Sequence, residues 1–234
     1  MTEQPTTGSQ FDTYAASYED AVNQSLAFVG MKVDYFTRVK AAYVIDLLHE
    51  HFGGTSGLSL LDIGCGVGNF HPLLGPHVAS LTGVDLSGEC LRQAESRNPG
   101  VSYRHYDGRR LPFADAGFDA AITVCVMHHV HPEQWRGFVA EMKRVVRPGG
   151  LAVVFEHNPL NPLTRRVVSN CEFDADAVLL GRRELRGLVA EAGFREVRSR
   201  AILSIPSSGR LTRRIDLALG LLSLGAQYYV RGVA

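Results

Sequence analysis

The glycine-rich segment Leu60–Phe70 is the first feature of this chain that could do chemistry. Its sequence, LLDIGCGVGNF, runs from an apolar stretch straight into a turn with glycines at positions 64, 66 and 68. These glycines let the backbone turn tightly and let a ligand approach the main chain, because no Cβ stands in the way. Dinucleotide sites use the same device, with backbone N–H groups and a helix N-terminus facing the pyrophosphate.

The residues around this turn argue against a pyrophosphate. Asp62 at its mouth would repel one, and Asn69 occupies the sixth place of the glycine pattern, where a dinucleotide site needs a small residue. A nucleoside with a cationic tail fits the turn better. We therefore expect S-adenosylmethionine, which carries a sulfonium and an ammonium, and we expect Asp62 to attract the ammonium directly or through water.

Two further aspartates, Asp85 and Asp107, follow the next two predicted strands. Ligands bind outside the carboxyl ends of the strands in an open parallel sheet, so these side chains are expected at the same site. Asp85 would accept hydrogen bonds from a ribose diol. Asp107 would accept a hydrogen bond from the exocyclic amine of adenine, while Gly108 gives backbone access to the edge of the ring. A structural alternative exists for each: Asp85 could cap the next helix, although Ser87 is the better cap, and Asp-Gly is a common turn pair.

Histidines and a glutamate gather at the predicted ends of the later strands. A methyl group leaves a sulfonium by in-line displacement, which needs positioning first and a base only when the acceptor arrives protonated. The candidate bases are His128, His129, His131, Glu156 and His157. We hypothesise that His157, whose side chain has a near-neutral reference pKa, is the base or orients the substrate, with Glu156 supporting it and His128 as a second candidate. Each histidine also has a structural alternative: His129 could simply pack in the protein, and His157 could hold Asn158 or the loop.

The elements that must position these residues alternate from residue 58 onward. Apolar runs predict strands at 58–63, 80–84, 101–106, 118–124, 151–155, 197–205 and 227–233. Helical patterns lie between them, up to about 74, at 88–98, at 133–146 and at 183–192. Repeated strand–helix units of this kind indicate an α/β fold with a doubly wound parallel sheet.

The N-terminal part and two long connections are predicted to lie outside this alternation. Residues 1–10 are expected to be disordered and residues 11–57 to form a helical cover, with a helix at 33–52 that ends at Gly53. Phe11, Tyr14 and Tyr18 share one helical face, where they pack on the main domain or, for either tyrosine, also cap a ligand. The main domain then spans residues 58–234, with inserted lid segments at about 157–182 and 206–225. Long connections at the carboxyl end of a strand are often functional.

Composition narrows the classes of function. A chain of 234 residues with 45% hydrophobic residues can bury one sizeable core. Its formal charge is zero and no basic patch carries interleaved aromatics, so no nucleic-acid partner is expected. The first ten residues lack the apolar run of a signal peptide, and the apolar tract at 217–224 is too short to span a bilayer. Four scattered cysteines predict a reduced, cytoplasmic protein without disulfides or a metal. The apolar stretch at 215–225 is core or the interface of a homodimer.

Several motifs together resemble one known family. They are residues 60–70, Gly83–Ser87, Asp107 with Leu111–Phe113, Phe118-Asp119, His128–Val130 and Arg147–Gly150. They resemble class I S-adenosylmethionine-dependent methyltransferases, most of all the small-molecule branch with ubiquinone-type and sugar-modifying members. The resemblance covers residues 11–157, and the remainder only in topology. It implies a Rossmann-like sheet of seven strands with an antiparallel last strand, and cofactor contacts at Asp62, Gly64, Gly66, Asp85, Leu86, Asp107, Gly108 and Val124. We add Cys65, inside the glycine turn, and Tyr18, on the aromatic face, as expected contacts.

These observations lead us to expect an enzyme that methylates a small metabolite. The methyl group would pass from S-adenosylmethionine to an oxygen or nitrogen of the acceptor, leaving S-adenosylhomocysteine, with no metal involved. A nicotinamide-dependent oxidoreductase is a second hypothesis, which Asp62 and Asn69 oppose. A non-catalytic S-adenosylmethionine-binding protein is a third, for which the retention of every cofactor residue would be unusual. The motifs do not specify the acceptor.

Overall fold

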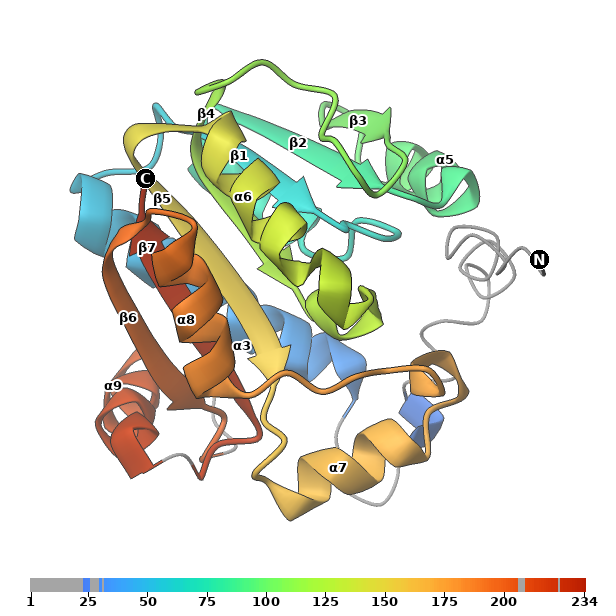
Figure 1. The fold of residues 1–234 in the computed structure, drawn as a ribbon, viewed down its shortest axis with the longest axis vertical. Coiled ribbons are helices and arrows are strands. Elements are labelled where there is room, and N and C mark those ends of the chain that lie inside the picture. The colour runs from blue at the N-terminus through green and yellow to red at the C-terminus, as the bar shows by residue number, and fades with distance from the viewer. Residues whose placement is uncertain (1–22, 26–29, 31, 206–208, 223) are drawn as a thin grey trace.

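A single sheet of seven strands organises the part of the chain that the structure describes. The structure is a computed structural model, and it describes residues 23–25, 30, 32–205, 209–222 and 224–234. The strand order is β3-β2-β1-β4-β5-β7-β6 (Figure 1). The strands are β1 (Ser59–Ile63), β2 (Ser80–Asp85), β3 (Ser102–His105), β4 (Phe118–Val124), β5 (Val146–His157), β6 (Arg195–Ile202) and β7 (Gln227–Val233). Strands β1 to β5 pair in parallel, and β7 runs antiparallel to both β5 and β6. The predicted mostly parallel α/β sheet of seven strands is confirmed.

Helices cover both faces of this sheet. The α-helices are α3 (Val33–Phe52), α4 (His71–Leu74), α5 (Gly88–Arg97), α6 (Trp135–Val145), α7 (Pro162–Ser169), α8 (Arg182–Glu191) and α9 (Arg210–Leu219). The 3₁₀ turns are η2 (Gly75–His77), η3 (Met127–His129), η4 (Pro132–Gln134), η5 (Glu172–Asp174) and η6 (Gly220–Leu222). Figure 1 shows α6 and α8 in front of the sheet and α3 behind it.

Alternate residues of the central strands feed the two cores between these layers. In β5, Val154 packs in the cluster with α6 and α8, whereas its neighbour Phe155 packs in the cluster with α3. Successive side chains of a strand point to opposite faces, so a strand buried on both sides reads as a continuous apolar run. This burial accounts for the run at Phe118–Val124, whose predicted bounds are confirmed as β4.

Local capping residues set the ends of the helices that lead to the site. Helix α3 ends where Gly53 adopts a left-handed conformation, with φ of 77°, as predicted. Helix α5 begins at Ser87, whose hydroxyl accepts a hydrogen bond from the backbone of Cys90 at 3.0 Å. Helix α7 begins after Asn161, whose side chain accepts from the backbone of Thr164 at 3.0 Å. Pro162 stands in the first turn of α7, where a missing N–H costs nothing.

The predicted bounds of two strands, β5 and β6, were wrong at both ends. Strand β5 begins at Val146, so the segment Arg147–Gly150, predicted as a turn before the strand, lies within its bounds, beside a register shift opposite Phe118. Strand β6 covers residues 195–202, not 197–205. Leu203 leaves the sheet with φ of 62°, and its N–H donates to the buried carboxylate of Asp216 at 2.7 Å instead of to a neighbouring strand.

The predicted insertions contain short helices. Residues 157–182 hold α7 and η5, and residues 206–225 hold α9 and η6. In the second insertion Ile215, Leu221 and Leu224 are exposed, so these side chains are not core, and an interface there stays a prediction. The expected tail 1–10 and the aromatic face with Tyr18 fall outside the described residues. Within those residues, the structure has no helix with the length and apolar character needed to cross a membrane.

Candidate active site

The glycine turn follows β1 at the carboxyl edge of the sheet. Gly64, Gly66 and Gly68 all have positive φ, at 75°, 53° and 74°, which explains why glycine stands at each position. A Cβ on Gly64 would lie 2.5 Å from the side chain of Val126, the second residue after β4. A Cβ on Gly66 would meet nothing within 4 Å. The turn therefore packs tightly toward β4 and leaves open space at Gly66.

Asp85, at the end of β2, holds this turn in place. One carboxylate oxygen accepts from the N–H of Gly66 at 2.8 Å, and the other accepts from the N–H of Ser87 at 2.9 Å. Burial raises the pKa of the Asp85 carboxyl, although these backbone donors work in the opposite direction. Because Ser87 caps α5, Asp85 is placed at the turn and is not the helix cap, as the sequence predicted.

Asp62, near the end of β1, and Cys65, in the glycine turn, have buried side chains. The Asp62 carboxylate is 2% exposed and lies 3.1 Å from Nε2 of His71, whose Nδ1 lies 2.6 Å from the hydroxyl of Tyr103. The thiol of Cys65 packs with Leu91 and Tyr103, and burial raises its pKa. Any contact that Cys65 makes with a ligand in this arrangement would come from its backbone. The predicted attraction of Asp62 for an ammonium stays a prediction.

The remaining predicted cofactor residues lie at neighbouring strand ends. Asp107 is exposed, and one of its oxygens accepts from the N–H groups of Arg109 and Arg110 at 2.9 and 3.2 Å, which lowers the pKa of its carboxyl. This is the geometry of the turn that the sequence allowed as an alternative. Gly108 has φ of 79° and packs against Leu86. Val124, half-buried, ends β4.

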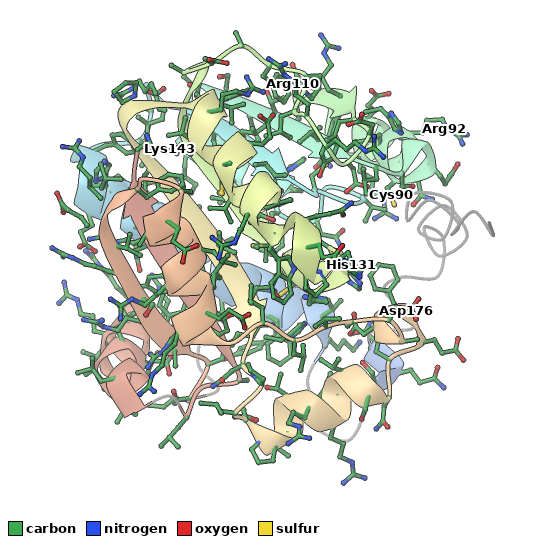
Figure 2. The ribbon with its side chains drawn as sticks, viewed as in Figure 1. Cys90, Arg92, Arg110, His131, Lys143 and Asp176 are labelled. Atoms are coloured by element: carbon green, nitrogen blue, oxygen red, sulfur yellow. The ribbon has the colours of Figure 1, made fainter. Side chains whose placement is uncertain are left out.

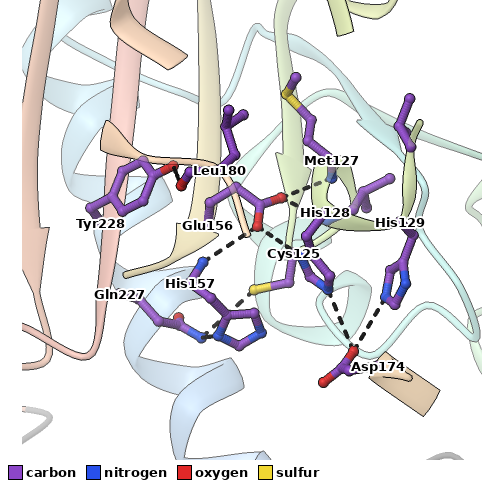
Figure 3. Close-up of polar contacts among 12 residues, drawn as sticks. Cys125, Met127, His128, His129, Glu156, His157, Asp174, Leu180, Gln227 and Tyr228 are labelled. Atoms are coloured by element: carbon purple, nitrogen blue, oxygen red, sulfur yellow. Dashed lines mark hydrogen bonds and ion pairs between the residues drawn. The ribbon is translucent and has the colours of Figure 1, made fainter. Parts of the chain in front are cut away.

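A second group of polar side chains lies where β4 and β5 end (Figure 3). Its centre is Glu156, which is fully buried. One oxygen of Glu156 accepts from the N–H groups of Val126 and Met127 at 3.1 and 2.8 Å, and the other lies 2.7 Å from Nδ1 of His128. The backbone N–H of His157 also donates to Glu156, at 3.3 Å. The structure thus brings together the predicted residues His128, Glu156 and His157.

His128 lies between two carboxylates. Its Nε2 is 3.5 Å from Oδ1 of Asp174, and Nε2 of His129 is 3.4 Å from the same oxygen. Burial lowers the pKa of His128, but the charge of Glu156 and the contact with Asp174 outweigh burial and raise it to about 10. Burial and the charge on His128 lower the pKa of His129 to about 3. The two adjacent imidazoles therefore differ in charge at neutral pH.

His157 is more accessible than His128. It is half-buried, and its ring centre lies 5.0 Å from that of His128. Its Nδ1 lies 3.4 Å from the side-chain amide of Gln227 on β7. The side-chain amide of Asn158 donates to the carbonyl of Gly225 at 2.7 Å, and the other expected role of His157, holding Asn158 or the loop, stays a prediction.

Sequence reasoning missed two residues that join the glycine turn to this cluster. Lys40 is buried on α3; its ammonium donates to the sulfur of Cys125 at 3.5 Å and lies 5.6 Å from the ring centre of Phe70. Cys125 follows β4 with φ of 57°. Burial raises the pKa of its thiol, but the charges of Lys40 and His157 lower it to about 7. A lysine on the apolar face of α3, between Val39 and Ala41, was the available signal.

Comparisons with known proteins find similarity to methyltransferases. Residues 61–154 match the family model described as "Methyltransferase domain". The chain is 35% identical over 112 residues to a phthiotriol/phenolphthiotriol dimycocerosates methyltransferase of Mycobacterium ulcerans, covering 46% of this chain and 41% of that protein. It is 36% identical over 107 residues to a demethylmenaquinone methyltransferase of Tropheryma whipplei, covering 44% of each. The chain thus spans about half or less of the length of these curated relatives.

A solved structure extends the likeness to nearly the whole chain. It is a protein of Thermotoga maritima described as a SAM-dependent methyltransferase, possible histamine N-methyltransferase. The TM-score is 0.69 at 22% identity, covering 97% of this chain and 99% of that one, and identity this low speaks for the fold alone. Residues 61–154 thus resemble the methyltransferase-domain family, and the chain shares the Rossmann-like fold of this solved structure over nearly its whole length.

Proposed function

We propose that this chain transfers a methyl group from S-adenosylmethionine to an oxygen or nitrogen of a small molecule. The observation that carries the proposal is that two sets of side chains meet at one edge of the sheet. The glycine turn, held by Asp85, packs against Val126 through Gly64, and Val126 donates its N–H to Glu156 in the histidine cluster. A methyl donor and its acceptor need such adjoining sites, because positioning supplies much of the acceleration of a displacement.

The glycine turn suits the donor by its shape and charge. S-adenosylmethionine supplies, when bound, a methyl group on a positively charged sulfur. The open space at Gly66 lets a ligand reach the backbone, and the buried Asp85 carboxylate beside it suits ribose hydroxyls. Asp107 and Gly108 would serve the adenine, and Asp62 contributes negative charge behind the turn.

Lys40 adds a positive charge on the other side of the turn. Lys40 is 7% exposed as a residue, and its ammonium, which lies beside Phe70, is suited to an anionic group. We assign this group to the carboxylate of the amino-acid tail of the donor, because Phe70 ends the glycine turn. Lys40 would hold this carboxylate, with Phe70 packing beside it.

His157 is the better of the two predicted bases. A pKa of about 10 keeps His128 protonated at neutral pH, so His128 is a poor proton acceptor there. His157 is half-buried and would take the proton from an acceptor hydroxyl or ammonium. Glu156 orients this part of the site through its bonds to the backbone of His157 and to the ring of His128.

The first insertion favours a small acceptor. Asp174 in η5 contacts both histidines of η3, and the N–H of Val178 donates to the carbonyl of His128 at 2.8 Å. Residues 157–182 thus close over the cluster, as a lid segment would, and this enclosure is unsuited to a polymer.

Ligand binding tests the donor first. Thermal shifts and calorimetry would compare S-adenosylmethionine, S-adenosylhomocysteine and NAD. We expect the first two to stabilise the protein, and Asp85→Asn to weaken their binding at least about tenfold, since a charge-assisted hydrogen bond is worth about 1.5–3 kcal/mol. Asp34→Asn, at an exposed carboxylate on α3 paired with Arg38, is the matched control. Stabilisation by NAD alone would overturn the proposal.

Product analysis then tests the transfer. The protein, the donor and a metabolite library would be incubated, and products that gain one methyl group identified by mass and fragmentation. With an acceptor in hand, we expect His157→Ala to lower kcat/KM by more than about threefold and to alter its pH profile. The control is His131→Ala, because the structure places this candidate base in an exposed position beside Glu133. Donor binding without any methylated product would favour a non-catalytic binding protein.

A further inference from the structure

Three side chains in the histidine cluster converge on one point. Nε2 of His128, Nε2 of His129 and a carboxylate oxygen of Asp174 all lie within 4.8 Å of one another. The Asp174 oxygen is 3.5 Å from the first nitrogen and 3.4 Å from the second. Figure 3 shows both imidazoles directed at Asp174 from η3. Within the described residues this is the one group of histidine, cysteine and acidic side chains with that spacing.

The spacing matches that of ligands around one metal ion. Zinc binds imidazole nitrogen and carboxylate oxygen at about 2.0–2.2 Å, so two ligands in a tetrahedral arrangement lie about 3.4 Å apart. The distances from the Asp174 oxygen to the two imidazole nitrogens, 3.5 and 3.4 Å, agree with this value. Three protein ligands would leave at least one coordination position for water or a substrate oxygen.

The surroundings of His128 supply the support that a metal-binding imidazole needs. Its second ring nitrogen, Nδ1, lies 2.7 Å from Oε2 of Glu156, and both residues are fully buried. Histidines that bind metals nearly always donate this second N–H to a carboxylate or carbonyl, which fixes the ring and leaves the other nitrogen for the ion. Glu156 is itself held by the backbone of Val126 and Met127.

Charge balance identifies the kind of ion. Glu156 and Asp174 bring two negative charges to a place where Glu156 and His128 are fully buried and Asp174 is 12% exposed. A divalent cation that displaces the proton of His128 would balance both charges, with two neutral imidazoles as ligands. Two nitrogen ligands and one oxygen ligand suit zinc, iron or cobalt better than magnesium or calcium, which prefer oxygen ligands.

We propose that His128, His129 and Asp174 bind one divalent transition-metal ion, zinc or a close analogue, with Glu156 positioning His128. The ion would lie beside His157, where its open coordination position can take an oxygen of the acceptor. This last role rests on the proposed methyl transfer, whereas the binding of the ion does not.

The test uses cobalt(II) as a probe, because its visible absorption reports coordination. Untagged full-length protein, stripped of metal with a chelator, would be titrated with cobalt(II) and then with zinc by calorimetry. We expect one ion per chain and displacement of cobalt by zinc. His129→Ala and Asp174→Ala are each expected to weaken binding more than about 100-fold, and Glu156→Gln by about 10–100-fold. His131→Ala and Asp176→Ala, two positions further along the chain and exposed (Figure 2), should change the affinity less than about threefold.

Two controls distinguish a lost ion from a lost fold. Circular dichroism and binding of S-adenosylhomocysteine show whether each variant is folded, and Asp174→Asn gives a second, milder change. Absence of cobalt binding in the wild-type protein, equal losses in the control variants, or a thiolate-to-metal band that disappears in Cys125→Ser would each overturn the proposal. Ion binding without methyl transfer would contradict the proposed function alone, and transfer by a protein that binds no ion would contradict the metal site alone.

Discussion

We predict that the contact between Lys40 and Cys125 controls the pKa of the Cys125 thiol. Replacing Lys40 by methionine keeps the length of the side chain and removes its charge. The Lys40 ammonium lies 3.5 Å from the sulfur, and its charge is the largest influence that lowers the pKa of this thiol to about 7. We expect Lys40→Met to raise the pKa of Cys125 above its ordinary value of 9.0, because burial then acts with less opposition.

The size of the effect follows from the distance. Opposite unit charges 3.5 Å apart, at an effective dielectric constant of about 20, attract each other by about 5 kcal/mol. One pKa unit corresponds to 1.36 kcal/mol, so the loss of Lys40 exceeds the shift of two units needed to return the thiol to 9.0. At pH 7 about half of the Cys125 thiols are ionised in the wild-type protein, and about 1% or less would be ionised in Lys40→Met. The thiolate population thus falls about 50-fold.

Ultraviolet absorbance of the thiolate measures this population directly. Titrations of the wild-type protein and of Lys40→Met would be corrected with the same titrations in a Cys125→Ser background, which removes the signal of the other cysteines and the tyrosines. Lys143→Met is the matched control. The Lys143 ammonium lies 5.6 Å from the ring centre of Phe194, just as the Lys40 ammonium lies 5.6 Å from that of Phe70. Among the described residues, however, Lys143 has no thiol contact like that of Lys40. A midpoint that stays near 7 in Lys40→Met, or one near 9 in the wild-type protein, would refute the reasoning.

Three further predictions concern the frame around the site. Asp216 accepts hydrogen bonds from the hydroxyl of Tyr43 and from the N–H groups of Leu203, Ser204 and Ile205. In urea unfolding, Asp216→Ala should therefore lower the free energy of unfolding by about 3–5 kcal/mol. The control Asp46→Ala, at a partly exposed ion pair, should lower it by less than about 1 kcal/mol. Gly64→Ala should weaken binding of S-adenosylhomocysteine at least about tenfold in calorimetry, because its φ is 75° and its Cβ would meet Val126, whereas Gly54→Ala, in open space, should not. Ser87→Ala should cost about 1 kcal/mol in the same urea titration through the lost cap of α5, and an unchanged midpoint would contradict that role.

The sequence predicted the parts of the fold that local patterns determine. The bounds of α3, β4 and β7 agree with the structure to the residue. Helix α3 has a stripe of buried side chains and ends in a left-handed glycine, and β4 is apolar because both of its faces are covered. The carboxylates of Asp62 and Asp85, beside the glycine turn, could also be placed, because each lies at the carboxyl end of a strand in a parallel sheet.

The contacts made between distant segments could not be predicted. Lys40 and Cys125 are 85 positions apart, and their meeting depends on how α3 crosses the sheet. Asp174 stood in a segment that broke the strand–helix rhythm, and no spacing linked it to His128 and His129. The end of β6 depends on Asp216, which takes the N–H of Leu203 away from the sheet. Long-range polar contacts of this kind decide acidity and ligand geometry, which composition and periodicity do not report.

The two carboxylates of the histidine cluster differ in what they do for the fold. Glu156 is fully buried at the end of β5 and satisfies two backbone N–H groups after β4, so its removal would leave donors without partners inside the protein. Asp174 lies in the insertion, 12% exposed, with its carboxylate against two imidazoles. A buried charge costs free energy. Glu156 accepts two backbone hydrogen bonds from the segment after β4 in return, whereas Asp174 makes no comparable contact with the sheet. Asp174→Asn should therefore lower the free energy of unfolding less than Glu156→Gln does, while altering ion binding, which makes Asp174 the better residue for separating chemistry from stability at this site.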